Sequence, residues 1–299
     1  MTSWMSPLPA ISSNLALAKA AGAGAIPLHV AWNAVESAGT GTCTPGAYTD
    51  PYSNMFAAFN GIFPAQNLKL SLTVNPMTTN VWTLPGDFSS ADFAADSSLV
   101  ATQNTIDIIA CRFNKMLDFI FTRIPDIEIV ALQIGNELDH TAQSTSSHFW
   151  ANYWRFYANV ATHARAIQGG LEQLNNTISD IIALTYYPMN GDFTVKDPTI
   201  SSADIASLVS VYTDVSKPIH LQEVGYHTGS AYSSSSQSKQ GHFIQDFFQT
   251  WDHYDTRIAF VSFLRLNDLS HSGAQILGNS YYAPGTAPPT LWNTWKLWA

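Results

Sequence analysis

Apolar and polar residues alternate along this chain with two different periods. Short runs in which every second residue is apolar, such as Leu68 to Val74, are typical of β-strands, and apolar residues three and four positions apart are typical of helices. The segment 99–123 has the clearest helical pattern, and Pro125 ends it. Helical segments alternate with strand segments, which predicts βαβ units and a parallel sheet.

The pattern predicts a set of strands that is too small to close a (β/α) barrel. Helices are predicted at 11–22, 53–64, 99–123, 147–168, 202–214, 236–251 and 291–298. Six clear strands are predicted at 25–32, 68–74, 127–134, 180–186, 218–223 and 258–264. A closed TIM barrel has eight strands. We therefore expect an α/β, TIM-barrel-like fold that is incomplete or irregular. No linker or repeat divides the sequence, so residues 1–299 are predicted to form a single domain.

Composition narrows the classes of partner. The formal charge is −9, from 13 Lys and Arg against 22 Asp and Glu, and no basic cluster is present. Nucleic acids and anionic membrane surfaces attract basic proteins, so neither is an expected partner. No apolar run approaches the roughly 18 residues of a membrane span. Few charges together with many aromatic residues are typical of proteins that handle neutral polar ligands, although a large buried interior explains the same composition.

Cofactor and redox signals are weak. Two cysteines, Cys43 and Cys111, make neither a disulfide framework nor a zinc site, and Cys111 is expected to be a buried thiol on its helix. No Gly-rich phosphate loop and no helical pair of metal-binding histidines is present, so no cofactor and no metal are expected. The start of the chain, Met1 to Pro9, lacks the basic-then-apolar order of a signal peptide. Localisation therefore stays open between the cytosol and secretion after removal of a leader.

Two glutamates carry the chemical prediction. Glu137 ends the strand at 127–134 within Gln133-Ile134-Gly135-Asn136-Glu137-Leu138, and Glu223 ends the strand at 218–223. Active sites of parallel α/β barrels lie at the carboxyl ends of the strands. A surface Glu that caps the next helix is the simpler explanation for Glu137, and a buried ion pair with Arg265 is the simpler one for Glu223. Two such ends in one chain favour a paired catalytic site.

The order of these motifs resembles that of clan A retaining glycoside hydrolases, which have TIM-barrel folds and include endo-β-glycanases. Asn136-Glu137 ends one strand, and the lone Glu223 ends a later strand. The resemblance implies that Glu137 is the acid/base and Glu223 the nucleophile, and that Asn136 binds the sugar 2-hydroxyl. Leu184-Thr185-Tyr186-Tyr187-Pro188 is similar to the segment whose Tyr orients the nucleophile, and Tyr187 is our choice for that role.

Other side chains at strand ends are candidates for ligand contacts. The aromatic candidates are Trp32, Trp82, Tyr186, Tyr187 and Tyr226, because sugar rings stack their C–H faces on such side chains, although core packing explains most aromatics in any protein. His140 and His227 also follow strand ends and are interpreted as loop residues or as hydrogen-bond donors to a ligand. Arg265 is interpreted as a further partner of Glu223.

Three functions therefore remain open. A retaining glycosidase needs one protonated carboxyl group and one ionised carboxylate, which the two glutamates would supply. A carboxylester hydrolase on a degenerate barrel is the second reading, although the Ser236-x-x-Lys239 motif is better explained as a helix cap. A carbohydrate-binding protein without turnover is the third. The expected substrate is a carbohydrate or a small ester, and a homodimer is expected to cover the sheet edges of an incomplete barrel.

Overall fold

The computed structural model describes residues 15–79, 81–95, 105–138, 147–167, 180–192, 194–228 and 234–263. The chain divides into two compact units. One comprises Ala23–Ser179 and is called the N-terminal unit; the other combines Met1–Gly22 with Asp180–Ala299 and is called the C-terminal unit. Each unit carries one parallel sheet with helices packed against it. The prediction of a single domain over 1–299 stays a prediction.

The sheet of the N-terminal unit is built around strand β2 (Lys69–Thr78). Strands β1 (Ala25–Ala31) and β4 (Ile129–Asn136) both pair with β2 in parallel, and the two-residue strand β3 (Val81–Trp82) folds back antiparallel to its end. Leu70, Leu72 and Val74 are fully buried, but so is Thr73, which faces the other way. Both faces of β2 are therefore covered, as is usual for a central parallel strand.

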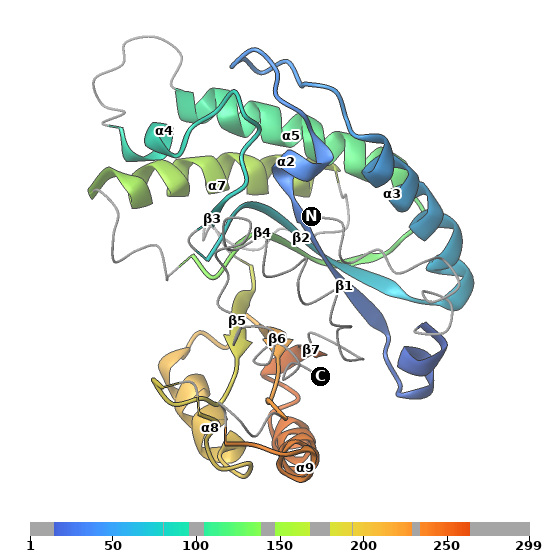
Figure 1. The fold of residues 1–299 in the computed structure, drawn as a ribbon, viewed down its shortest axis with the longest axis vertical. Coiled ribbons are helices and arrows are strands. Elements are labelled where there is room, and N and C mark those ends of the chain that lie inside the picture. The colour runs from blue at the N-terminus through green and yellow to red at the C-terminus, as the bar shows by residue number, and fades with distance from the viewer. Residues whose placement is uncertain are drawn as a thin grey trace. The chain divides into compact units, whose positions relative to one another are not determined.

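Helices cover this sheet (Figure 1). The long helices α5 (Thr105–Arg123) and α7 (Ser147–Ile167) run side by side, while α3 (Asp50–Ile62) packs against α5. The short elements are α2 (Trp32–Val35), the 3₁₀ helix η1 (Pro64–Gln66) and α4 (Ser90–Ala94). Helix α4 begins with a capping box, in which Ser89 and Asp92 satisfy each other's backbone N–H groups.

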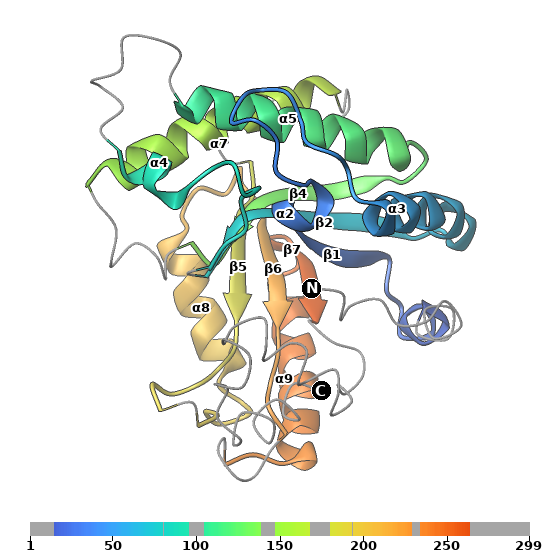
Figure 2. The same ribbon diagram turned by 45° about the horizontal axis from the view of Figure 1, so that its top comes forward.

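The C-terminal unit holds a second parallel sheet in the order β5 (Ile182–Tyr186), β6 (Ile219–Val224) and β7 (Ile258–Phe263). Helices α8 (Ser201–Val211) and α9 (Gln237–His253) lie beside each other along this sheet (Figure 2). Alternate residues of β6 bury against them: Ile219 and Leu221 join Phe243 and Phe247 of α9 in one apolar core. The intervening polar residues of β6 therefore point to the opposite face.

All six predicted strands are confirmed, with end shifts of a few residues, and so are the five helices predicted between 53 and 251. Within the described residues six strands run parallel, fewer than the eight of a closed barrel. The prediction missed β3, because Pro76 reads as the end of the preceding strand. In the structure β2 continues through Pro76, where its register against β4 shifts between Val74 and Thr78.

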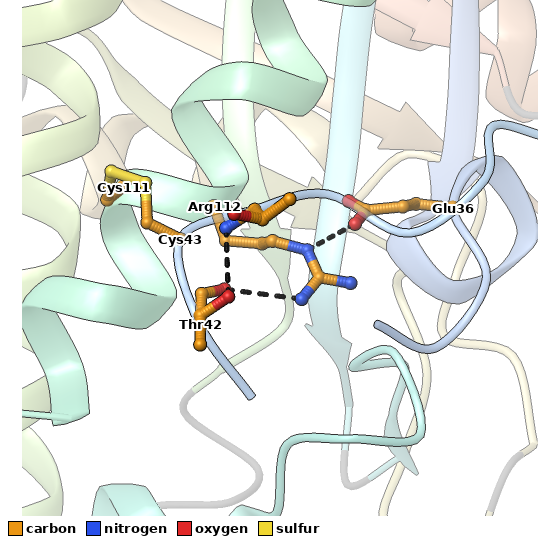
Figure 3. Close-up of a disulfide and its surroundings, with 6 residues drawn as sticks. Glu36, Thr42, Cys43, Cys111 and Arg112 are labelled. Carbon is orange, nitrogen blue, oxygen red and sulfur yellow. Dashed lines mark hydrogen bonds and ion pairs between the residues drawn. A yellow bond between two sulfur atoms is a disulfide. The ribbon is translucent and has the colours of Figure 1, made fainter. Parts of the chain in front are cut away.

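The prediction for the cysteines is wrong. Cys43 and Cys111 form a disulfide across 68 positions of sequence, so Cys111 is not a free core thiol (Figure 3). Helix α5 has the buried face that the pattern predicts, but Cys111 lies at its partly exposed edge, next to the loop that carries Cys43. The pairing joins a loop to a helix, and such a contact leaves no periodic signal in the sequence.

Candidate active site

Both predicted catalytic glutamates lie at the carboxyl end of a parallel strand. Glu137 comes directly after β4 in the N-terminal unit, and Glu223 is the fifth residue of β6 in the C-terminal unit. Each lies among polar or aromatic side chains at that edge of its own sheet.

Glu137 has a backbone conformation that non-glycine residues rarely adopt. Its φ is +49°, and Gly135 two positions earlier has a φ of +82°. A side chain at Gly135 would also meet the Tyr153 hydroxyl at 2.5 Å, and this hydroxyl donates a 2.9 Å hydrogen bond to the Ile134 carbonyl. Tyr153 belongs to helix α7, so this hydrogen bond attaches the carboxyl end of β4 to that helix. Non-glycine residues held in the left-handed region cluster at functional sites, which supports a role for Glu137.

The turn between β2 and β3 holds the Glu137 carboxylate. Thr79 donates its hydroxyl to Glu137 Oε2 at 2.8 Å and its backbone N–H to the Asn136 carbonyl at 2.8 Å. Thr79 itself has a φ of +54°. Two residues in the left-handed region therefore face each other across the strand ends, and the hydroxyl contact fixes one carboxylate oxygen.

Three other residues surround this edge of the N-terminal sheet. Asn136 is buried, and its Oδ1 accepts a 3.3 Å hydrogen bond from Gln133. Trp82 is partly buried and packs against Phe93, with ring centroids 4.9 Å apart. Burial lowers the pKa of His29 on β1 to about 4, and the negative charge of Glu137 opposes that shift. His29 is therefore neutral at physiological pH.

Glu223 accepts the hydrogen bond expected from a tyrosine. The Tyr187 hydroxyl donates to Glu223 Oε2 at 2.8 Å, and the Glu223 side chain is largely buried. A donor aimed at a carboxylate favours the ionised form, which is the form a nucleophile requires. Tyr187 follows the last residue of β5, so the bond joins the ends of two neighbouring strands.

The backbone around Glu223 is shaped for this contact. Thr185 of β5 lies opposite Glu223, whereas Leu184 lies opposite Leu221, so Gln222 is an extra residue and β6 bulges there. Bulges next to active sites redirect a side chain. Gly225 then leaves room for the Tyr187 ring, because a Cβ there would lie 2.6 Å from Tyr187 Cε1.

Four predicted ligand-binding residues are buried within their units. Tyr186 donates a 3.3 Å hydrogen bond to Asp204, and Tyr226 donates a 2.6 Å hydrogen bond to the Lys196 carbonyl. Burial lowers the pKa of His227 to about 4. Trp32 is fully buried, and its indole N–H donates to Glu36 at 2.9 Å. A role for these four residues in ligand binding remains a prediction, and the proposed binding surface does not include them.

Two predicted site residues, His140 and Arg265, lie outside the described residues. The cap interpretation of Ser236 is confirmed, since its Oγ accepts from the Lys239 N–H at the start of α9.

Over the described ranges, no cluster of His, Cys, Asp or Glu has the composition of a metal site. None of the helices in that part of the chain is long and apolar enough to cross a membrane.

Two residues of the N-terminal unit, Thr79 and Arg112, were missed from the sequence. Thr79 gave no signal, because its contact depends on the turn into β3. Arg112 did leave a signal: it falls between Ile109, Phe113 and Met116 on the apolar face of α5. A charged residue at a core position indicates a buried partner, and Arg112 pairs with Glu36 and Asp87.

Comparison with known proteins identifies the fold. No protein-family model and no curated protein matches the sequence. Among solved structures, an exo-β-1,4-mannosidase from Opitutaceae bacterium strain TAV5 matches with a TM-score of 0.63 and 14% identity, over 99% of this chain and 52% of that one. The chain thus spans about half the length of the mannosidase.

Two further structures show the same likeness. A GH5_18 protein from Bifidobacterium longum, solved in complex with Manβ1-4GlcNAc, matches with a TM-score of 0.63 and 12% identity, over 98% of this chain and 69% of that one. β-Glucosidase 2 from the fungus Trichoderma reesei matches with a TM-score of 0.54 and 10% identity, over 86% and 78% of the two chains. The chain therefore has a TIM-barrel-like α/β fold similar to that of these solved structures, with fewer than eight parallel strands within the described residues.

Proposed function

We propose that this chain is a retaining glycoside hydrolase that cleaves β-glycosidic bonds in an oligo- or polysaccharide. Glu137 is the acid/base and Glu223 the nucleophile. The observation that carries the proposal is the hydrogen bond from Tyr187 to Glu223 at the carboxyl end of β6. A donor at this distance orients the largely buried carboxylate and favours its ionised form, which attack on a sugar requires.

The reaction would proceed in two displacements. Glu137 donates its proton to the glycosidic oxygen while Glu223 attacks the anomeric carbon, which forms a covalent glycosyl-enzyme and releases the leaving sugar. Glu137 then takes a proton from water, and the resulting nucleophile cleaves the ester bond to Glu223. Thr79 keeps the Glu137 carboxyl group at the strand end through both steps.

The substrate is expected to be neutral. Charged residues make up only 12% of the chain, and the side chains around Glu137 and Glu223 are hydroxyl, amide and aromatic groups. Trp82 and Tyr187 offer ring faces of the kind on which pyranose rings stack. The solved structures with this fold include a mannosidase and a β-glucosidase, so β-mannosides and β-glucosides are the first compounds to test.

A mechanism-based label tests the nucleophile. Activated 2-deoxy-2-fluoro-β-mannosides and β-glucosides should attach one sugar to the peptide that contains Glu223, as read by mass spectrometry. Glu223→Gln should remove the label. Glu137→Gln should slow hydrolysis of substrates with poor leaving groups by roughly 10²- to 10⁴-fold, and much less for dinitrophenyl glycosides, which need little acid assistance.

The competing functions predict different results. Hydrolysis of short-chain aryl esters that survives both glutamate substitutions would indicate an esterase. Oligosaccharide binding by calorimetry without turnover or labelling would indicate a carbohydrate-binding protein. A label that persists in Glu223→Gln would remove Glu223 from the mechanism. The expected homodimer remains a prediction, which light scattering at micromolar concentration tests.

A further inference from the structure

A loop follows β1 and α2 in the N-terminal unit and closes on itself at its base. Glu36 and Tyr48 form an isolated antiparallel bridge, and the Ser37 N–H donates to the Ala47 carbonyl at 2.9 Å. We call residues 37–47 the strap loop. Its sequence, Ser-Ala-Gly-Thr-Gly-Thr-Cys-Thr-Pro-Gly-Ala, contains no large apolar side chain. The loop therefore cannot pack a core of its own, and its order depends on outside anchors.

Arg112 of α5 is the first anchor (Figure 3). Its guanidinium is fully buried and pairs with Glu36. It pairs with Asp87 as well, at 2.8 Å. It also donates to two strap-loop carbonyls, of Thr42 at 3.3 Å and Ser37 at 3.4 Å. Gly39 lies directly against it: a Cβ there would be 2.5 Å from Arg112 Nη2. The buried guanidinium therefore holds the loop in place, as packed apolar side chains would in a loop with a core of its own.

The disulfide is the second anchor. Cys111 precedes Arg112 on α5, and its partner Cys43 lies in the strap loop. Cys43 and Cys111 are both partly exposed, so a reductant in solution can reach the bond. Exposed disulfides are the ones that are reduced and reformed most readily.

The strap loop is also connected to the candidate active-site edge. The Gly41 N–H donates to Asp87 at 2.7 Å, and Asp87 belongs to the segment that follows Trp82. Burial alone would raise the pKa of Asp87, but the N–H groups of Gly39 and Gly41 and the Arg112 guanidinium lower it to about 2. β1 runs parallel to β2 and β4, so the loop leaves the sheet at the same edge as Glu137.

We infer that the Cys43–Cys111 disulfide is a redox-sensitive latch on substrate binding. In the oxidised protein the strap loop is ordered and supports the segment that carries Trp82. On reduction the loop loses one anchor and becomes mobile around Cys43, while Arg112 and Asp87 still hold residues 37–42 and the sheet keeps the unit folded. The effect on substrate affinity rests on the proposed function; the change in loop order does not.

The redox step needs a dithiol. One thiolate of the reductant attacks a sulfur of the disulfide, a mixed disulfide forms, and the other cysteine leaves as a thiolate that takes up a proton. The second thiol of the reductant then displaces the remaining cysteine and closes an internal disulfide. Two electrons pass from the dithiol to the protein, which ends with two thiols.

Hydrogen exchange of the full chain, oxidised and reduced with dithiothreitol, tests the latch. Amides of the strap loop should exchange about tenfold faster or more after reduction, while amides of β1, β2 and β4 keep their protection. The double variant Cys43→Ser/Cys111→Ser should show the fast loop exchange without reductant and should not respond to dithiothreitol. With a β-glycoside substrate, KM should rise several-fold on reduction and kcat should stay unchanged.

The outcomes are separable. Unchanged loop exchange after complete reduction, verified by thiol alkylation and mass spectrometry, would overturn the latch. Loss of protection throughout the N-terminal sheet would overturn it as well, because the disulfide would then hold the whole unit together. A loop that responds in a protein without glycosidase activity would refute the proposed function and leave the change in loop order standing.

Discussion

The Tyr187 hydroxyl and the Glu223 carboxylate are joined by a hydrogen bond of 2.8 Å that links the ends of two adjacent parallel strands. Glu223 is largely buried, so this donor replaces water that the carboxylate would otherwise bind. The same bond orients Oε2 of the carboxylate, while the position of Oε1 depends on the other side chains around Glu223. Activity should therefore depend on a hydroxyl group that forms no covalent bond to substrate.

Tyr187→Phe should lower kcat by roughly 10- to 100-fold, because hydrogen bonds to charged groups contribute about 1.5–3 kcal/mol. The melting temperature should also fall by a few degrees, because the same bond stabilises the buried carboxylate in the folded protein. Tyr186→Phe is the matched control: it removes a neighbouring hydroxyl that bonds to Asp204 rather than to Glu223, and kcat should stay close to that of the unmodified protein. Steady-state kinetics on aryl β-glycosides measure both. Equal losses in the two variants would contradict the positioning role of Tyr187.

Gly225 should be required only because the Tyr187 ring is present. Gly225→Ala should destabilise the protein by about 1–3 kcal/mol, the usual cost of overpacking, because the new Cβ meets the ring. In a Tyr187→Ala background the same substitution should cost much less. Urea unfolding of the two single variants and the double variant measures the coupling. Additive losses would show that Gly225 has another function.

The strands and the two glutamates were predictable for a simple physical reason. Parallel strands that helices cover leave a run of buried apolar residues in the sequence. A carboxylate directly after such a run lies at the carboxyl end of the strand, as Glu137 does after β4. Tyr187 was also identified as the partner of Glu223, from a short motif. These signals are local, and each involves neighbouring positions or one strand end.

Contacts between distant segments were not predictable. Thr79 meets Glu137 only because β2 continues past Pro76 and turns into β3. Tyrosine often binds sugars at strand ends, but helices α8 and α9 bury Tyr186 and Tyr226. Their hydroxyls donate to Asp204 and to the Lys196 carbonyl within the same unit. Whether a helix buries a given residue at a strand end depends on how the helix packs, and no single sequence motif predicts that packing.

Arg112 should be a major determinant of stability. Arg112→Met leaves the carboxylates of Glu36 and Asp87 without their cation and should cost about 3–5 kcal/mol. Arg112→Met combined with Glu36→Gln should recover part of that loss, since one of the two unpaired charges is gone. Chemical denaturation with the disulfide intact measures the free energy of unfolding. A change below about 1 kcal/mol in Arg112→Met would be that of an ordinary surface substitution and would refute the prediction.

Stability should fall in mild acid. Burial lowers the pKa of His220 to about 4, below the ordinary value of 6.5, so the unfolded chain binds the proton more tightly. The stabilisation is complete above pH 6.5 and is lost as the pH falls to 4, on the order of 3 kcal/mol for this one residue. Asp87 does not contribute in this window, because its pKa of about 2 places its loss at lower pH.

His29 and His227 have pKa values lowered to about 4 in the same way, so His220→Asn should reduce the dependence of the melting temperature on pH between 6.5 and 4 by about a third rather than remove it. Phe260, whose ring lies 5.2 Å from that of His220, provides the control. Phe260→Leu should lower the melting temperature without changing its slope against pH, since no titrating group is removed. An unchanged slope in His220→Asn would assign the acid sensitivity to other groups.

Cys111 and Arg112 are consecutive residues of one helix, so the directions of the two strap-loop anchors around the helix axis are fixed relative to each other, about 100° apart. Adding one residue to α5 ahead of Cys111 would turn both side chains by about 100° around the helix axis and move them away from the loop together. The length of that helix is thus coupled to the loop across 68 positions of sequence. Homologues that lose the cysteine pair can accept insertions there only if they also give up the buried guanidinium.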